Sequence, residues 1–174
     1  GSTVSTGNSA PTVNAGGNYV IPADTPFTLT ASGSDSNGDP VTYSWEQFNA
    51  DNAQSDLSSA DDGVGPLFRS WPAISDSSRT FPNVVDLAAN TTPVGELLPS
   101  LARTMDFRIT ARDNHPGAGA YAYDDMSVQV VATGSAFQVT SPNTAVTYSG
   151  GSTQTVTWDV AGTTANGINV SDVA

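Results

Sequence analysis

The sequence contains no cysteine and no lysine, and His115 is its single histidine. Without cysteine the chain can form neither a disulfide framework nor a thiolate metal site, so packing, with or without a bound ion, must stabilise the fold. With one histidine it cannot build a three-ligand zinc site or the H-E-x-x-H motif of zinc peptidases. No stretch approaches the ~20 apolar residues of a membrane-spanning helix, so we expect no membrane insertion.

Positive charge is scarce as well. Five arginines face 17 acidic side chains, and the net charge at pH 7 is -12. Such a charge repels nucleic acid and anionic membrane surfaces, so we expect no nucleic-acid partner. The same acidity suits a solvated surface, a cation-binding protein or an extracellular setting.

Hydrophobic and polar residues alternate with a period of two, which is typical of strands with one buried face. The alternating stretches are residues 27–31, 41–46, 105–112 and 121–132. Residues 11–21 indicate an edge strand that is interrupted at 15–17. Pro11 favours an edge position because it has no backbone N–H to donate to a central β-ladder. Short strands joined by Gly, Pro and Asp turns, without long amphipathic helices, predict an all-β fold. We expect an immunoglobulin-like antiparallel β-sandwich over 11–132.

Residues 49–103 lose this alternation and are rich in Asp, Ser, Gly, Asn and Pro. They predict a long loop-rich insertion, which scattered apolar residues would pack back onto the sandwich. Two stretches that begin at proline, 82–87 and 93–98, each predict one helical turn.

The two ends of the chain lie outside the predicted sandwich. Residues 1–10 are expected to comprise a cloning remnant, Gly1-Ser2, and a polar lead-in. After a linker at 133–136, residues 137–174 show a second β pattern that is too short to enclose its own core. We expect a truncated second immunoglobulin-like module, which leans on a neighbour or shares strands in a homodimer.

An acidic turn, Asp35-Ser36-Asn37-Gly38-Asp39-Pro40, separates two of the predicted strands. Carboxylate and amide oxygens are ligands that Ca²⁺ prefers, and a sandwich gathers loops that are distant in sequence at one end. The candidate calcium ligands are Asn8, Asp35, Asn37, Asp39 and Asp113. The alternative is an Asx turn, in which these side chains only bind backbone groups. His115 is expected in an exposed loop.

Exposed aromatic side chains would give the module a binding function instead. Flat rings provide contact area at a low cost in conformational entropy. The candidates for contact with a protein or polysaccharide are Phe68, Trp71, Tyr121 and Tyr123. No nucleophile elbow G-x-S-x-G is present, and we expect no catalytic activity.

Several segments together resemble known modules. Residues 10–16, the turn at 35–39 and Tyr43-Ser44-Trp45-Glu46-Gln47 resemble polycystic-kidney-disease-like and cadherin-like modules. The stretches 65–70, 79–82, 96–99 and 107–114, and the start of the second module at 156–163, resemble the region downstream of the catalytic domain in secreted bacterial reprolysin-like zinc metallopeptidases.

The resemblance implies a non-catalytic, calcium-stabilised accessory or spacer domain of a secreted peptidase, in contact with neighbouring domains. In modules of the polycystic-kidney-disease type, ligands come from the lead-in asparagine, the acidic turn and the aspartate after the penultimate strand. These correspond here to Asn8, Asp35, Asn37 and Asp113, with Asn37 in place of an aspartate. The alternative function is an adhesion module for collagen-like protein or polysaccharide.

Overall fold

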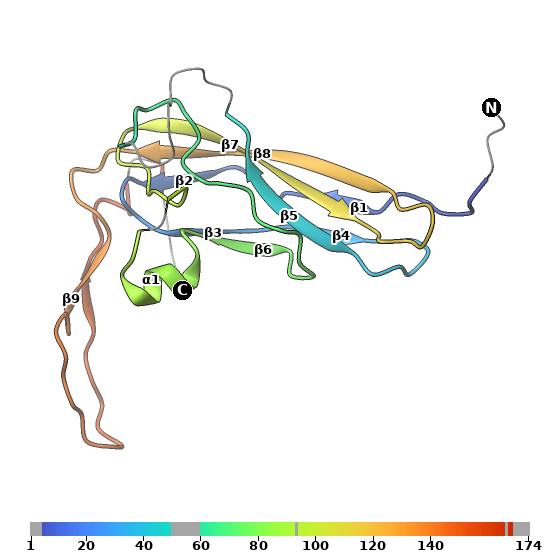
Figure 1. Cartoon of the computed structure of the whole chain (residues 1–174). Coiled ribbons are helices and arrows are strands. Elements are labelled where there is room, and N and C mark those ends of the chain that lie inside the picture. Colours follow the sequence, from blue (N-terminus) through green and yellow to red (C-terminus); the bar gives the residue numbers. More distant parts are fainter. Residues whose placement is uncertain (1–4, 50–59, 93, 166, 169–174) are drawn as a thin grey trace.

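A computed structural model describes residues 5–49, 60–92, 94–165 and 167–168, and within them the chain forms a β-sandwich with a separate hairpin at one end (Figure 1). The sandwich contains eight strands and one short helix. Its elements are β1 (Thr12–Asn14), β2 (Tyr19–Pro22), β3 (Phe27–Thr30), β4 (Ser32–Ser34), β5 (Thr42–Gln47), β6 (Ser78–Phe81), α1 (Val84–Ala89), β7 (Arg103–Arg112) and β8 (Tyr121–Val131). The predicted all-β sandwich is therefore confirmed.

One layer is a four-stranded sheet in the order β2-β8-β7-β5. The other layer consists of the pairs β1-β4 and β3-β6, which follow one another because only Ala31 separates β3 from β4. Every strand pair is antiparallel except β2 with β8, which is parallel. This parallel pair departs from the predicted antiparallel pattern, because the first predicted strand changes sheets between β1 and β2. Gly16, with a φ of +85°, lies in the break between β1 and β2.

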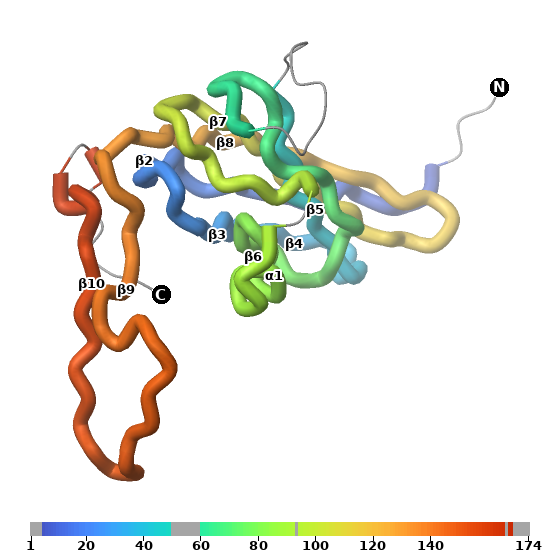
Figure 2. The backbone as a smooth tube through the Cα atoms, turned by 60° about the vertical axis from the view of Figure 1, so that its left-hand side comes forward, coloured from blue at the N-terminus to red at the C-terminus, as the bar shows by residue number. Residues whose placement is uncertain are grey.

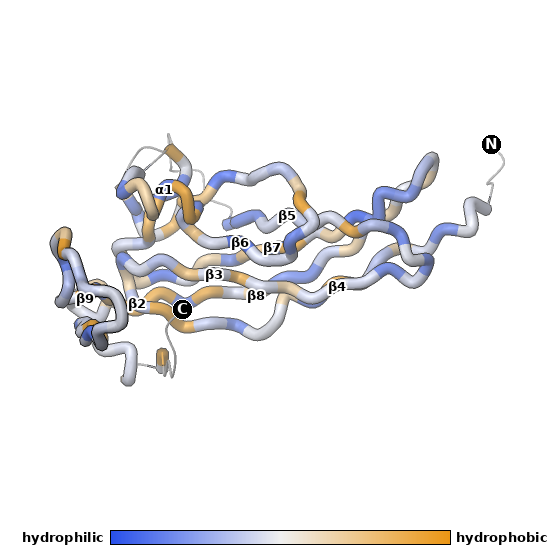
Figure 3. Tube along the Cα trace, turned by 90° about the horizontal axis from the view of Figure 1, so that it is seen from below, coloured by the Kyte–Doolittle hydropathy of each residue, from blue (hydrophilic) through white to orange (hydrophobic). Residues whose placement is uncertain are grey.

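The core lies between the layers and is strongly aromatic. Phe81 and Phe107 are fully buried, with ring centroids 5.0 Å apart, and Phe27 and Phe68 pack against both. In β5 and β7 the buried residues follow the predicted period of two, which places Trp45 and Ile109 in this core. Hydrophobic and hydrophilic stretches alternate along the strands, whereas the loops at the end beside the N-terminus are mostly hydrophilic (Figure 3).

The described part of the insertion packs back onto the sandwich as predicted; residues 50–59 lie outside the description. One predicted helical turn is present as α1, which Asn83 caps by accepting from the backbone N–H of Val85 at 2.8 Å. The second predicted helical turn, over 93–98, was wrong for the described residues 94–98. Glu96 instead forms an isolated β-bridge with Phe68. No described helix is long and apolar enough to cross a membrane.

The second β pattern appears as two further strands, β9 (Gln138–Ser141) and β10 (Thr157–Asp159), which pair antiparallel. Their hairpin projects away from the sandwich at the end farthest from the N-terminus (Figure 2). Both strands are exposed throughout, and an isolated two-stranded ribbon is only marginally stable in water. The strand-sharing homodimer stays a prediction.

Candidate functional site

Three loops that are distant in sequence meet at the end of the sandwich beside the N-terminus, on the right in Figure 1. They are the lead-in before β1, the acidic turn between β4 and β5, and the turn between β7 and β8. Hydrogen bonds join all three, so Asp35 and Asp113 lie at the same end of the molecule. We call this end the acidic pole and define it by the predicted ligands Asn8, Asp35, Asn37, Asp39 and Asp113 together with His115.

The acidic turn is built on one carboxylate oxygen. Asp35 Oδ1 accepts the backbone N–H groups of Asn37 and Asp39 at 2.8 and 3.1 Å. Gly38, at a φ of +82°, closes the turn by donating to the Asp35 carbonyl at 3.3 Å. The Asx turn weighed as the alternative to calcium is therefore present, but it occupies only Oδ1 of Asp35.

The lead-in is tied to both neighbouring loops. Asn8 Nδ2 donates to Asp113 Oδ2 at 2.7 Å and to the Ala118 carbonyl at 2.9 Å. The next residue, Ser9, donates its backbone N–H to Asn37 Oδ1 at 2.9 Å. These bonds fix the chain where it enters the sandwich.

Asp113 is a fully buried carboxylate at the centre of this network. Its Oδ1 accepts the backbone N–H groups of His115 and Ala120 at 3.2 and 2.9 Å. Burial raises the pKa of Asp113, but the hydrogen bonds from Asn8, Ala120 and His115 and the charge of His115 outweigh it. The pKa therefore lies below its ordinary value, and Asp113 is a charged acceptor at neutral pH.

Asp39 is engaged by the single histidine. Its Oδ2 lies 2.8 Å from His115 Nδ1, and both side chains are partly exposed. The expectation that His115 only occupies an exposed loop was therefore incomplete. Its spacing of two residues from Asp113 was the signal that could have placed it here.

Two buried oxygens of this pole have no hydrogen-bond partner, namely Asn8 Oδ1 and Asp35 Oδ2. A buried acceptor without a partner is unfavourable, so such atoms usually face an ion or water. Amide and carboxylate oxygens are the donors that Ca²⁺ takes, and this donor set fits it. No three His, Asp or Glu side chains in the described part of the chain gather closely enough to hold a metal by themselves. An ion here would need backbone carbonyl or water oxygens in addition.

The four predicted binding aromatics do not form one surface. Phe68 is 2 % exposed and belongs to the core, so its assignment as an exposed contact was wrong. A buried aromatic in a loop-rich stretch has no periodic pattern to reveal it. Tyr121 and Tyr123 are 63 and 54 % exposed on the outer face of β8, where the Arg108 guanidinium lies 4.0 Å from the centroid of the Tyr123 ring.

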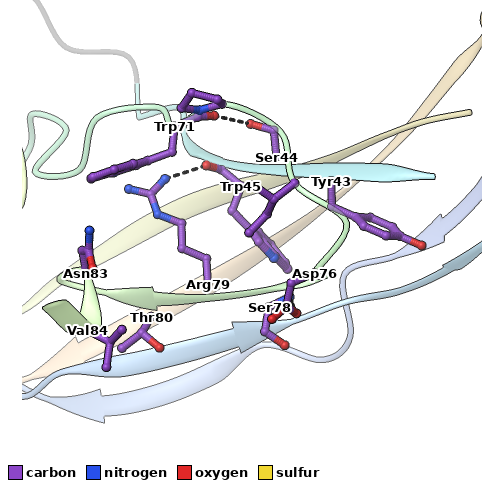
Figure 4. A pocket seen from close by; sticks show the side chains of 12 residues that line it. Tyr43, Ser44, Trp45, Trp71, Asp76, Ser78, Arg79, Thr80, Asn83 and Val84 are labelled. Atoms are coloured by element: carbon purple, nitrogen blue, oxygen red, sulfur yellow. Dashed lines mark hydrogen bonds between the residues drawn. The ribbon is translucent and has the colours of Figure 1, made fainter. Parts of the chain in front are cut away.

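Trp71 is half-buried and holds the insertion in place. Its Nε1 donates to Oε1 of Glu96 at 2.5 Å, and the guanidinium groups of Arg69 and Arg79 lie 4.7 and 5.9 Å from its ring centroid. Arg79 also donates to Glu96 at 2.8 Å. It donates to the Trp45 carbonyl at 2.8 Å as well (Figure 4). The fully buried Glu96 is thus paired within this cluster, and its burial is what the sequence analysis missed.

Comparison with known proteins does not identify a family for this chain. No model of a protein family matches it, and no curated protein shows significant similarity to it.

Proposed function

We propose that this chain is a non-catalytic, calcium-stabilised β-sandwich that serves as an accessory or spacer module. The observation that carries the proposal is the pair of buried, unpartnered oxygens, Asn8 Oδ1 and Asp35 Oδ2. They belong to two segments that the hydrogen bond from Ser9 to Asn37 joins. A divalent cation would give both oxygens a partner and would offset the negative charge of the pole.

The hydrogen bonds divide the predicted ligands by role. Asn8 and Asp35 offer unoccupied side-chain oxygens to an ion. Asp113 orients the Asn8 amide through its contact of 2.7 Å, and Asn37 holds the lead-in by accepting from Ser9. Asp39 is paired with His115 and is the weakest candidate for direct coordination.

Such an ion would act as a staple on the fold. Because Asn8 precedes β1, calcium would fasten the entering chain to the acidic turn between β4 and β5. Binding to the folded state alone stabilises it by about 2.7 kcal/mol at a hundredfold excess over Kd. The acidic pole and the β9–β10 hairpin lie at opposite ends of the sandwich (Figure 1), which suits a module that spaces its neighbours.

The identity of the whole protein rests on the resemblance of the sequence motifs. On that basis we propose that the module belongs to a secreted bacterial zinc metallopeptidase of the reprolysin-like type. In this proposal the neighbouring domains of that protein are its partners and carry the catalysis.

Thermal melting in EGTA and in CaCl₂ tests the calcium proposal. Asp35→Asn keeps the Oδ1 acceptor of the Asx turn but replaces the unpartnered Oδ2 by an amide nitrogen. Asp62→Asn is the matched control, because Asp62 forms a comparable turn with Val64 and Gly65 in an exposed loop. We expect calcium to raise the midpoint of the wild type and of Asp62→Asn but not that of Asp35→Asn. Equal midpoints of the wild type in both buffers would refute the proposal.

A second candidate function, adhesion to protein or polysaccharide, is favoured by the exposure of Tyr121 and Tyr123. Retention on insoluble collagen, chitin and cellulose tests it. We expect the double variant Tyr121→Ala/Tyr123→Ala to lose any retention that the wild type shows. The lack of retention of the wild type on all three matrices would rule out these partners.

A further inference from the structure

We propose that the groove between β5 and β6 is a docking site for an extended peptide, which would add a strand to the free edge of β6. The groove encloses about 320 Å³ on the side of the sandwich where each layer ends (Figure 4). Tyr43 and Trp45 line it from β5, and Ser78 and Thr80 line it from β6.

The two edges that border the groove differ. On the β5 side, Tyr43 and Ile74 exchange both backbone hydrogen bonds, at 2.7 and 3.0 Å, so residues 71–76 already cover that edge. In the described part of the chain, β6 pairs only with β3. Its second edge is therefore the one that a partner can reach.

The register of β6 shows which backbone groups are offered. Ala31 donates to the Ser77 carbonyl at 3.2 Å, so the backbone groups of Ser77 face β3. Along an antiparallel strand every second residue directs its N–H and carbonyl groups to the same neighbouring strand, so those of Arg79 and Phe81 also face β3. Those of Ser78 and Thr80 face away from β3. The Ser78 N–H is used locally by Asp76 Oδ1 at 2.8 Å. The N–H and carbonyl of Thr80 and the carbonyl of Ser78 remain for a partner strand.

The side chains that line the groove determine which side chains an added strand would need. Two apolar side chains that line it, Ile74 and Val84, are 55 and 63 % exposed. A peptide residue opposite Thr80 would point outward, and its two neighbours would point inward against Trp45 and Trp71. The partner is therefore an extended segment with apolar side chains at alternate positions, held by main-chain hydrogen bonds.

A saccharide suits this groove less well. Sugar rings stack on exposed aromatic faces, but the Trp71 ring is already contacted by the guanidinium groups of Arg69 and Arg79. Arg79 already donates to Trp45, Arg69 and Glu96, so most of its N–H groups are not available to sugar hydroxyls. The inference rests on the fold and does not depend on calcium.

Binding of the labelled peptide acetyl-Ser-Val-Thr-Ile-Thr-Val-Ser-amide to the full chain tests the proposal by fluorescence anisotropy. The peptide is uncharged, so the net charge of -12 does not bias the result. We expect saturable binding with a Kd below about 1 mM. The same peptide N-methylated along its central residues, and one with serine in place of valine and isoleucine, should each bind at least about tenfold more weakly.

Two protein variants locate the site. Thr80→Pro removes the N–H on the free edge without removing a ladder bond, and proline is tolerated there. Val84→Ser removes an apolar wall, and Val94→Ser is the control because Val94 is 61 % exposed but does not line the groove. We expect the first two to weaken binding at least about tenfold and the control to leave it unchanged. If Thr80→Pro melts early, Val84→Ser and the methylated peptide decide the question.

Several results would overturn the proposal. These are no binding of the parent peptide, equal binding of the methylated peptide, and competition by chitohexaose or cellohexaose. Self-association that Thr80→Pro abolishes would assign the edge to a second copy of this chain instead.

Discussion

Asn8 and Asp113 are 105 residues apart in the sequence, yet the Asn8 amide donates to a carboxylate oxygen of Asp113 at 2.7 Å. This contact joins the segment that enters the sandwich to the turn between its two longest strands. Because Asp113 is fully buried, it depends on protein donors to remain charged. The acidic pole is thus a tertiary structure that exists only after the strands have paired.

This relationship predicts that Asn8→Ala destabilises the fold even without calcium. The substitution removes a donor from buried Asp113 and leaves one of its oxygens unpaired. We expect the melting midpoint in EGTA to fall by several degrees, and any stabilisation by calcium to shrink as well. Ser5→Ala, in the exposed lead-in, is the control and should melt like the wild type. Equal midpoints of Asn8→Ala and the wild type in EGTA would show that the contact does not form in solution.

The buried cluster around Glu96 predicts a larger effect. Glu96→Ala leaves the guanidinium of Arg79, whose side chain is 13 % exposed, without its counter-charge. Breaking a buried ion pair by removing one partner costs about 3–5 kcal/mol, which urea unfolding would measure. Glu46 is the only other glutamate and forms no ion pair in the described residues. Glu46→Ala should therefore change the free energy of unfolding by no more than about 0.5 kcal/mol. Equal losses for the two variants would contradict this account.

The strands could be predicted from the sequence because burial follows a period of two along them. Residues 105–112 alternate in the sequence, and β7 alternates in burial in the same way as far as Ile109, after which Thr110 is buried as well. The place where the first strand changes sheets could not be predicted. The residues of β1 and β2 suit an edge in either layer, and the break near Gly16 carries no information about which sheet follows.

The residues that meet at the acidic pole could be predicted from the sequence, but the hydrogen bonds that they form could not. Oxygen-bearing side chains in three loops, together with the resemblance to known modules, indicated which residues would meet. Whether each oxygen binds a backbone N–H, a histidine or nothing depends on loop geometry, as the different partners of Asp35 and Asp39 show. Glu96 was not recognised as buried because it lies in a stretch without periodicity, and the same lack of periodicity left Phe68 open to assignment as an exposed contact.

The aromatic core predicts a severe effect for Phe107→Ala. Phe107 has no exposed surface and contacts the rings of Phe27, Phe68 and Phe81. Removing a buried phenylalanine side chain costs about 3–5 kcal/mol, from lost burial and from the cavity that remains. Urea unfolding should show this loss, whereas Val84→Ala, at a site 63 % exposed, should cost no more than about 0.5 kcal/mol. A loss near 1 kcal/mol for Phe107→Ala would mean that the core can collapse around the missing ring.

The outer face of the sheet predicts a small, pH-dependent contribution from Arg108 and Asp125. Arg108 donates to both carboxylate oxygens of Asp125, at 2.7 and 2.8 Å, across β7 and β8. These hydrogen bonds lower the pKa of Asp125, the charge of Arg108 adds to the effect, and partial burial opposes it. A carboxylate whose pKa is lower in the folded state stabilises the fold above its unfolded pKa, about 3.9.

This stability is lost as the pH falls through the lower, folded pKa. We therefore expect Asp125→Asn to melt slightly earlier than the wild type at pH 7, with a difference that disappears near pH 2. Both side chains are more than a third exposed, so the difference at pH 7 should be small and should shrink further in about 1 M NaCl. Thermal melting of both proteins across this pH range, at low and high salt, provides the measurement. A difference that grows as the pH falls would contradict this account. It would mean that Asp125 binds its proton more tightly in the folded protein than in the unfolded chain, whereas this ion pair requires the opposite.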